Sequence, residues 1–246
     1  MKQIELNKSI IRDFYRRVVA GGDLDYADQL IADDYIQHST TVKPGKAGLL
    51  EALRYMRQMP KPAAPTRPLM RLIAEDDYVV TNLSFAIGGK QKAVVDLFRL
   101  RDGQLVEHWD AVEDQPEKSL NGNSMLDGPV EIEDVAFTAE NKALAGEFFQ
   151  GVWVNRDLKL LPEYVAADLI QHQPDMANER EGLEHYLRQK ADRLVIEKIG
   201  RIIGDGNFVV IQSEGQVDQK PCAFYHIFRL RERKIVEQWT VKQMIP

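Results

Sequence analysis

Two carboxylates and a histidine lie close together in DLFRLRDGQLVEHWD, residues 96–110. Asp96 begins this stretch, and His108 and Asp110 end it with one residue between them. Residues two apart on a strand share a face, and a hairpin could bring Asp96 onto the same face. Burial on an apolar wall raises the pKa of a carboxylate, and a second carboxylate raises it further. The three groups therefore predict acid/base chemistry, such as removal of a proton next to a carbonyl.

The hairpin turn decides whether these side chains share a face. A two-residue turn at Asp102-Gly103 would place Asp96 and His108 on opposite faces. A three-residue turn at 101–103, with Gly103 left-handed in a G1 bulge, would place Asp96 directly opposite His108. We favour the three-residue turn because one apolar surface then surrounds the polar groups, formed by Val94, Phe98, Leu100, Val106 and Val112.

Other residues of the first half could contact a substrate. His38 follows a predicted helix and could donate to a substrate carbonyl. Tyr15 lies on the inner stripe of the first predicted helix and could orient a ligand. Phe98 and Trp109 are aromatic candidates for substrate contact, although Trp109 suits a core or a domain interface better. No HxH or HExxH spacing is present, so the sequence predicts neither a metal site nor a cofactor.

Each of the main candidates also has a structural interpretation. His38 could bond to the backbone at a helix end, and Asp110 could pair with a nearby Arg or Lys. His108 could hydrogen-bond to Asp96 as a satisfied core pair, and Asp96 could face solvent if the register differs. These alternatives stay open at the level of sequence.

The chain is a tandem repeat. Residues 7–38 align without a gap on residues 141–172, with 11 identities in 32 positions and an offset of 134. After the proline-rich residues 60–68 the offset falls to 130, and 96–110 align on 226–240 with 7 identities in 15 positions. We predict two copies of one domain joined by a Gly- and Asn-rich linker, with boundaries 1–117, 118–135 and 136–246.

The second copy lacks the acid/base residues of the first. At the positions of Asp96, His108 and Asp110 it carries, in order, His226, Gln238 and Thr240. An amide and a hydroxyl cannot act as a base at neutral pH, so we predict at most one catalytic site per chain. The histidines of the second copy, His172 and His226, could still bind a ligand, or this copy could serve only as a packing partner.

Each copy is predicted as about three helices followed by long strands. In the first copy, apolar periodicity predicts helices at 4–20, 23–32 and from Pro44 onward. Alternation predicts a short extended stretch at 35–40 and strands at 67–75, 78–88, 91–101 and 104–114. Helices followed by an antiparallel meander predict an α+β domain, whose curved sheet encloses a cone-shaped cavity for a small molecule. The proline-rich 60–68 would lie at the rim of this cavity, as a lid or as an ordinary loop.

The motif YIQH at 35–38, followed by DLFRLRDGQLVEHWDAVED at 96–114, resembles the SnoaL-like branch of the NTF2-like superfamily, which has a cystatin-like cone fold. The resemblance extends over nearly the whole chain, once per copy. The branch includes polyketide cyclases that catalyse an intramolecular aldol condensation, and the wider superfamily includes isomerases, dehydratases and members without known activity. The resemblance implies that Asp110, at the end of HWD, is the general acid/base. The family's strand histidine is replaced here by Asp96, and it reappears in the second copy as His226.

Two functions of different classes follow from these residues and this resemblance. The first is a cofactor-independent acid/base enzyme that cyclises, isomerises or dehydrates a small hydrophobic carbonyl compound. The second is a non-catalytic protein that binds a small molecule or serves assembly.

Composition excludes several other classes. The chain has 246 residues and a net charge of −6, which argues against a nucleic-acid binder. The single cysteine, Cys222, excludes an internal disulfide and a Cys-based zinc site. No apolar run approaches the roughly 20 residues of a membrane span, and the charged N-terminus is unlike a secretory signal. We therefore expect a cytoplasmic protein whose copies pack as an intrachain pseudo-dimer, with further homo-oligomerisation open.

Overall fold

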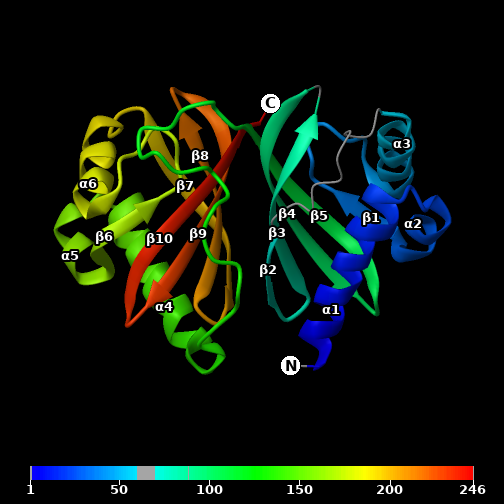
Figure 1. Cartoon of the computed structure of the whole chain (residues 1–246), viewed down its shortest axis with the longest axis horizontal. Coiled ribbons are helices and arrows are strands. Elements are labelled where there is room, and N and C mark those ends of the chain that lie inside the picture. Colours follow the sequence, from blue (N-terminus) through cyan, green and yellow to red (C-terminus); the bar gives the residue numbers. More distant parts are fainter. Residues whose placement is uncertain (1, 60–69, 88, 246) are drawn as a thin grey trace.

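The computed structural model describes residues 2–59, 70–87 and 89–245. In these residues the chain forms two α+β units side by side, each with one sheet that has helices on the side away from the other unit (Figure 1). The predicted fold class is confirmed. The proline-rich 60–68 lies outside the described residues.

The first unit begins with helices and ends with four antiparallel strands. Its elements are α1 (Lys2–Asp13), the π-helical η1 (Phe14–Ala20), α2 (Leu24–Leu30), β1 (Ile31–Gln37), α3 (Gly45–Gln58), β2 (Met70–Glu75), β3 (Tyr78–Ile87), β4 (Lys90–Arg101) and β5 (Gln104–Asp114). The strand order is β1-β5-β4-β3-β2, and β1 runs parallel to β5.

The second unit repeats this order of elements. It consists of η2 (Val135–Phe137), α4 (Thr138–Phe148), the π-helical η3 (Phe149–Val154), η4 (Leu158–Leu160), α5 (Leu161–Tyr164), β6 (Val165–Gln171), α6 (Glu179–Gln189), β7 (Leu194–Asp205), β8 (Phe208–Val217), β9 (Lys220–Arg231) and β10 (Lys234–Met244). Its sheet order, β6-β10-β9-β8-β7, matches that of the first unit strand for strand.

Contacts at its two ends explain where helix α2 begins and ends. The Asp23 side chain accepts a hydrogen bond from the Tyr26 backbone at 3.0 Å and caps the helix. The helix ends at Leu30, not at the predicted residue 32, because Ile31 already pairs with Leu105 of β5. The predicted extended stretch therefore begins earlier and forms a seven-residue strand.

The β4–β5 hairpin corrects the predicted register. Its turn has two residues, Asp102 and Gly103, with φ of 52° and 80°. A β-bulge near Leu100 then shifts the pairing, so that Asp96 lies opposite Asp110, not opposite His108. The prediction of a three-residue turn is therefore wrong.

Asp96, His108 and Asp110 nevertheless share one face of the sheet, as predicted. A two-residue turn alone would have put Asp96 on the other face, and the extra residue of the bulge brings it back. The three polar residues share the side of the sheet that faces the helices. The bulge also changes one apolar neighbour, because Leu105, not the predicted Val106, joins the core under the helices.

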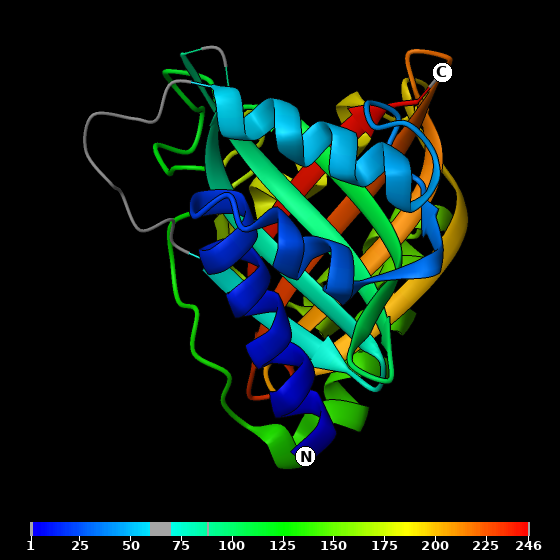
Figure 2. The ribbon, with the colours of Figure 1, turned by 90° about the vertical axis from the view of Figure 1, so that its right-hand side faces the viewer.

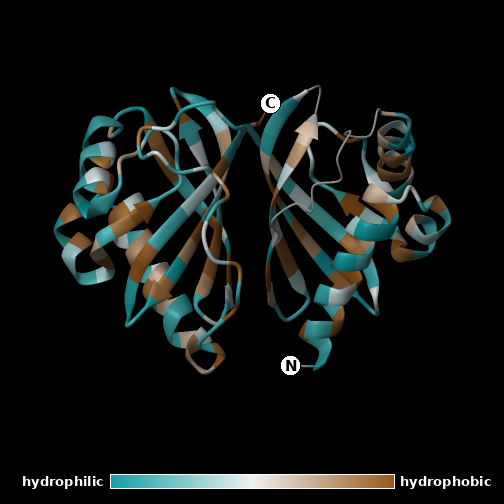
Figure 3. Cartoon of the chain, viewed as in Figure 1, coloured by the Kyte–Doolittle hydropathy of each residue, from teal (hydrophilic) through white to brown (hydrophobic). Residues whose placement is uncertain are grey.

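The two sheets pack against each other through their other faces. Figure 2 shows α1, α2 and α3 in front of the first sheet, with the second sheet behind it. Hydrophobic residues recur along the strands of both sheets (Figure 3). They form one core under the helices of each unit and a third core between the sheets. Each sheet is therefore buried on both faces.

Reciprocal hydrogen bonds relate the two units by an approximate two-fold axis. The Glu75 carboxylate accepts from the backbone of Gly204 at 2.9 Å, and its counterpart Asp205 accepts from the backbone of Ala74 at 2.9 Å. The units thus pack as a homodimer would, although a single chain forms both.

The segment between the units packs into the interface between the two sheets. We call residues 119–130 the strap. Its Met125 and Leu126 are buried between the sheets. At Gly128, where φ is +101°, an added Cβ would lie 2.5 Å from an oxygen of Glu237 and 2.9 Å from Trp239. Only glycine fits this position without displacing its neighbours.

Candidate functional site

The acid/base residues of the first unit form one hydrogen-bonded network. His108 Nε2 lies 3.0 Å from Asp96 Oδ1, and the Tyr15 hydroxyl donates to Asp96 Oδ2. Tyr15 also lies 2.8 Å from the hydroxyl of Thr81 on β3. Burial, and then the charge of Asp96, raises the pKa of Tyr15 well above its ordinary value, so this phenol stays protonated. Asp96 thus holds both partners in place.

The second nitrogen of His108 also faces an acceptor. His108 Nδ1 lies 2.9 Å from Oε1 of Gln37 on β1, and the same oxygen accepts from the Ser39 backbone at 3.1 Å. The Ser39 N–H requires this orientation of the Gln37 amide. An oxygen therefore lies within hydrogen-bond distance of each ring nitrogen of His108, and the two contacts fix the orientation of the ring.

Asp110 lies next to this pair and remains available. Its Oδ2 accepts a hydrogen bond of 2.9 Å from the Ser39 hydroxyl. Burial raises the pKa of Asp110 above its ordinary value; the His108 charge opposes this shift, and the Asp96 charge adds to it. No Arg or Lys ion pair to Asp110 occurs in the described parts of the chain. Asp110 is therefore a base with a raised pKa.

Two buried donors near Asp110 were not predicted. The Tyr35 hydroxyl and Gln37 Nε2 are buried and have no hydrogen-bond partner among the described residues. Burial raises the pKa of Tyr35, and the charges of Asp110 and Asp96 raise it further. Unpartnered buried donors are costly unless a ligand or water satisfies them. The spacing within YIQH was the available signal, since Tyr35 and Gln37 are two residues apart on one strand.

His38 and Trp109 lie on the opposite face of the sheet. Gln37 pairs with His108 across β1 and β5, so the next residue, His38, points away from the helices. His38 Nε2 lies 2.8 Å from Glu107 Oε1, and its ring stacks on Trp109 with centroids 4.7 Å apart. The prediction that His38 and Trp109 contact a substrate in this site is therefore wrong. Phe98 adjoins the site, as Tyr15 does, with its ring centroid 4.7 Å from that of His108.

The interior of the second unit is filled. His226 is 1% exposed and is surrounded by Phe149, Trp153, Phe224 and Phe228. Burial lowers the pKa of His226 to about 3, so it is neutral. Trp153 occupies the repeat position of Val19, and this larger side chain takes up interior space.

Several buried polar atoms of this interior still lack a partner in the described chain. They are Trp153 Nε1, Gln171 Nε2 and Oε1, His226 Nε2 and Gln238 Oε1. A water or a small polar ligand would satisfy them. His172 does not belong to this interior, because it stacks on Trp239 at 4.8 Å and bonds to Glu237 at 2.9 Å. The prediction that His172 contacts a ligand in the second cavity is therefore wrong.

Replacing Trp153 by valine should reopen the second interior. We expect Trp153→Val to lower the free energy of unfolding by about 3 kcal/mol, because it leaves a cavity in a close-packed core. Trp153→Phe, which keeps a ring, should cost less. Urea unfolding measures both, and equal stability of Trp153→Val and wild type would contradict the filled interior.

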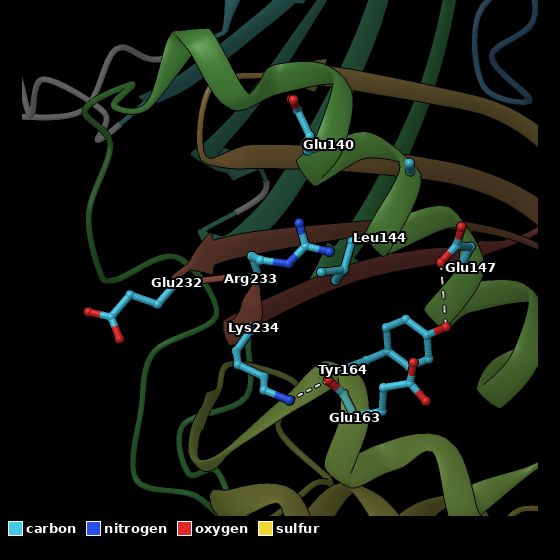
Figure 4. A pocket seen from close by; sticks show the side chains of 9 residues that line it. Glu140, Leu144, Glu147, Glu163, Tyr164, Glu232, Arg233 and Lys234 are labelled. Carbon is cyan, nitrogen blue, oxygen red and sulfur yellow. Dashed lines mark hydrogen bonds between the residues drawn. The ribbon is translucent and has the colours of Figure 1, made fainter.

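A surface pocket of about 420 Å³ lies outside both interiors (Figure 4). It is formed by α4, α5 and the β9–β10 turn, and Glu140, Glu147, Arg233 and Lys234 are among its lining residues. Lys234 donates to the backbone carbonyl of Glu163. The pocket contains none of the acid/base residues and is open to solvent, so it is not the candidate site.

The described residues contain no group of three or more His, Cys, Asp or Glu side chains that could hold a metal ion. None of the described helices has the length and apolar character needed to cross a membrane.

A sheet curved around helices, with a carboxylate–histidine pair on its inner wall, defines a cone-fold α+β domain. Residues 11–108 match the SnoaL-like domain family. The match lies within the first unit, and the second unit repeats the strand order of the first. No protein of curated function matches the sequence.

Solved structures of the same fold resemble about half of the chain. An NTF2-like protein of unknown function from Burkholderia xenovorans is 23% identical and covers 47% of this chain and 89% of its own, with a TM-score of 0.38. An NTF2-like protein of unknown function from Mesorhizobium loti is 20% identical over 45% and 93%, with a TM-score of 0.36. A SnoaL-like polyketide cyclase from Agrobacterium tumefaciens is 12% identical over 42% and 91%, with a TM-score of 0.36.

Proposed function

We propose that the first unit is a cofactor-independent acid/base enzyme for a small hydrophobic carbonyl compound. The reaction is of the cyclase, isomerase or dehydratase type, and Asp110 is the general acid/base. The observation that carries the proposal is the environment of Asp110: a half-buried carboxylate with a raised pKa, bonded to Ser39 beside the His108–Asp96 pair. The SnoaL-like family supports the same class of reaction.

The proposed reaction begins with Asp110 as the base. Its carboxylate takes a proton from the carbon next to the substrate carbonyl, and the electron pair of that C–H bond moves into an enolate. The unpartnered donors Tyr35 and Gln37 then stabilise the enolate oxygen. In an isomerisation, Asp110 returns the proton to another carbon. In a cyclisation, the enolate carbon attacks a second carbonyl of the same molecule, and the proton passes to the new alkoxide.

Tyr15 and Asp96 position the other groups in this proposal. Asp96 is hydrogen-bonded to Tyr15 and to His108, so it holds both side chains in place and leaves Asp110 as the carboxylate that can act on a substrate. The charge of His108 opposes the rise in the pKa of Asp110 that burial causes. Asp96 therefore takes the place of the family's strand histidine as a positioning residue.

The alternative function is non-catalytic binding of a small molecule. Its support is a set of buried polar atoms in the second unit, among them His226 Nε2 and Gln238 Oε1, that lack a partner in the described chain and that a molecule as small as water would satisfy. We also propose domain boundaries at 1–117, 118–135 and 136–246, since β5 ends at Asp114 and η2 begins at Val135.

Proton exchange in heavy water separates the two functions. The protein is incubated with cyclic and polyketide-like ketones, and NMR follows the loss of their α-protons. An enzyme should accelerate exchange of at least one ketone, with a rate that rises with pH through the raised pKa of Asp110. Thermal stabilisation by a ketone without any exchange would instead support the binding protein.

A further inference from the structure

Three side chains on one side of the interface between the units bind the strap. The Trp239 ring lies between His172, stacked at 4.8 Å, and the guanidinium of Arg71, 3.9 Å from the ring centroid. All three donate to strap carbonyls: His172 Nδ1 at 2.6 Å from Ser124, Trp239 Nε1 at 2.8 Å from Asp127, and Arg71 at 2.6–3.0 Å from Asp127, Pro129 and Leu126. This trio is a receptor for the backbone carbonyls of an irregular segment.

The pseudo-two-fold axis creates the same trio on the other side of the interface. Trp109 lies between His38, stacked at 4.7 Å, and the guanidinium of Arg201, 3.9 Å from its ring centroid. Arg201 donates to Gln212, as Arg71 donates to Asn82 at the repeat position. We call His38, Trp109 and Arg201 the open trio.

In the described parts of the chain, no segment binds the open trio as the strap binds its counterpart. Its Trp109 Nε1, His38 Nδ1, and Arg201 Nε and Nη2 have no hydrogen-bond partner in the described chain. The His38 side chain is 40% exposed, whereas that of His172 is 3% exposed. The donors that bind strap carbonyls on one side of the interface are thus unoccupied on the other side.

We propose that the open trio binds an irregular peptide segment of a partner protein by its backbone carbonyls. The strap sequence MLDGP, residues 125–129, defines the class of ligand: hydrophobic residues followed by x-Gly-Pro. Glycine is required because a Cβ at Gly128 would meet Glu237, and Glu107 stands at the repeat position beside His38. Proline restricts the backbone dihedral φ of its own residue and so limits the freedom of the segment that presents the carbonyls.

A peptide of the strap sequence, residues 119–130, tests the proposal on the full chain. NMR follows the three indole N–H signals, assigned with Trp→Phe variants. We expect a saturable shift of the Trp109 signal, with unchanged Trp239 and Trp153 signals. Arg201→Ala should weaken binding at least about tenfold, the range for losing a charged hydrogen bond. His38→Phe keeps the stacked ring, removes its donor and should also weaken binding. The exposed Arg16→Ala should have no effect.

Two further measurements test whether the open trio recognises a backbone with glycine at this position. A peptide with valine at the position of Gly128 should bind at least about tenfold more weakly, because the Cβ would collide with the glutamate. Inorganic phosphate at equal concentration should not displace the strap peptide. A shift of the Trp239 signal alone, tolerance of the valine peptide, full displacement by phosphate, or no shift of Trp109 would each overturn the proposal.

Discussion

Asp110→Asn is expected to lower the rate of ketone proton exchange by about 10²–10⁴-fold, the usual contribution of a positioned general base. The amide has the same shape and can still accept from Ser39, but it cannot take a proton. The fold should persist, because Asp110 makes no ion pair with Arg or Lys in the described chain. NMR exchange rates, with circular dichroism as the check on folding, measure this effect.

The same substitution should not lower the free energy of unfolding at neutral pH, although it lowers the exchange rate. Burial raises the pKa of Asp110, so the folded state binds the proton more tightly than the unfolded chain does. The wild-type protein therefore loses relative stability as pH rises through this raised pKa, whereas Asp110→Asn does not. At pH 7 the variant should be at least as stable as wild type, and any advantage should disappear below about pH 4.

Asp102→Asn is the matched control for Asp110→Asn. Asp102 is exposed in the β4–β5 turn at φ 52°, a conformation that asparagine tolerates well. Its exchange rate should equal that of wild type. Full activity of Asp110→Asn, or an equal loss in both variants, would contradict the role of Asp110.

Arg71→Ala is expected to lower the free energy of unfolding by about 3–5 kcal/mol, as does removal of one partner from a buried charged network. Arg71 is 1% exposed and donates to Asn82 and to three strap carbonyls. Its removal leaves these buried oxygens unpaired and a space beside Trp239. Although burial lowers the pKa of Arg71 to about 10, the guanidinium stays charged at neutral pH.

The pseudo-symmetric variant Arg201→Ala is the natural control. Arg201 occupies the same place against Trp109, but it bonds only to Gln212 among the described residues. Its loss should therefore cost about 1 kcal/mol. Urea unfolding of both variants measures the difference. Equal losses would show that the strap contacts of Arg71 contribute nothing beyond the stack on tryptophan.

Much of the fold could be predicted because helix and strand periodicities are local. The strands predicted at 78–88, 91–101 and 104–114 differ from β3, β4 and β5 by one residue at most. The repeat likewise required only comparison of the chain with itself. The face shared by Asp96, His108 and Asp110 was also predicted, although the turn and the bulge that produce it were not.

The site was predicted only in part, because distant pairings complete it. Tyr35 and Gln37 reach the site since β1 runs parallel to β5, a pairing between segments about 70 residues apart. The same pairing sends His38 to the other face. A histidine after a helix gives no local sign of which face it will take.

The sequence by itself determined that one α+β unit is repeated and that only the first copy carries a carboxylate and a histidine on one strand face. These properties depend on residue type and short-range alternation, which the chain encodes directly. The tertiary structure alone decided which partners surround Asp110, that Trp153 fills the second interior, and that the strap covers one trio and leaves the other open. These outcomes depend on packing between remote segments, where shape and unpaired polar groups select the arrangement.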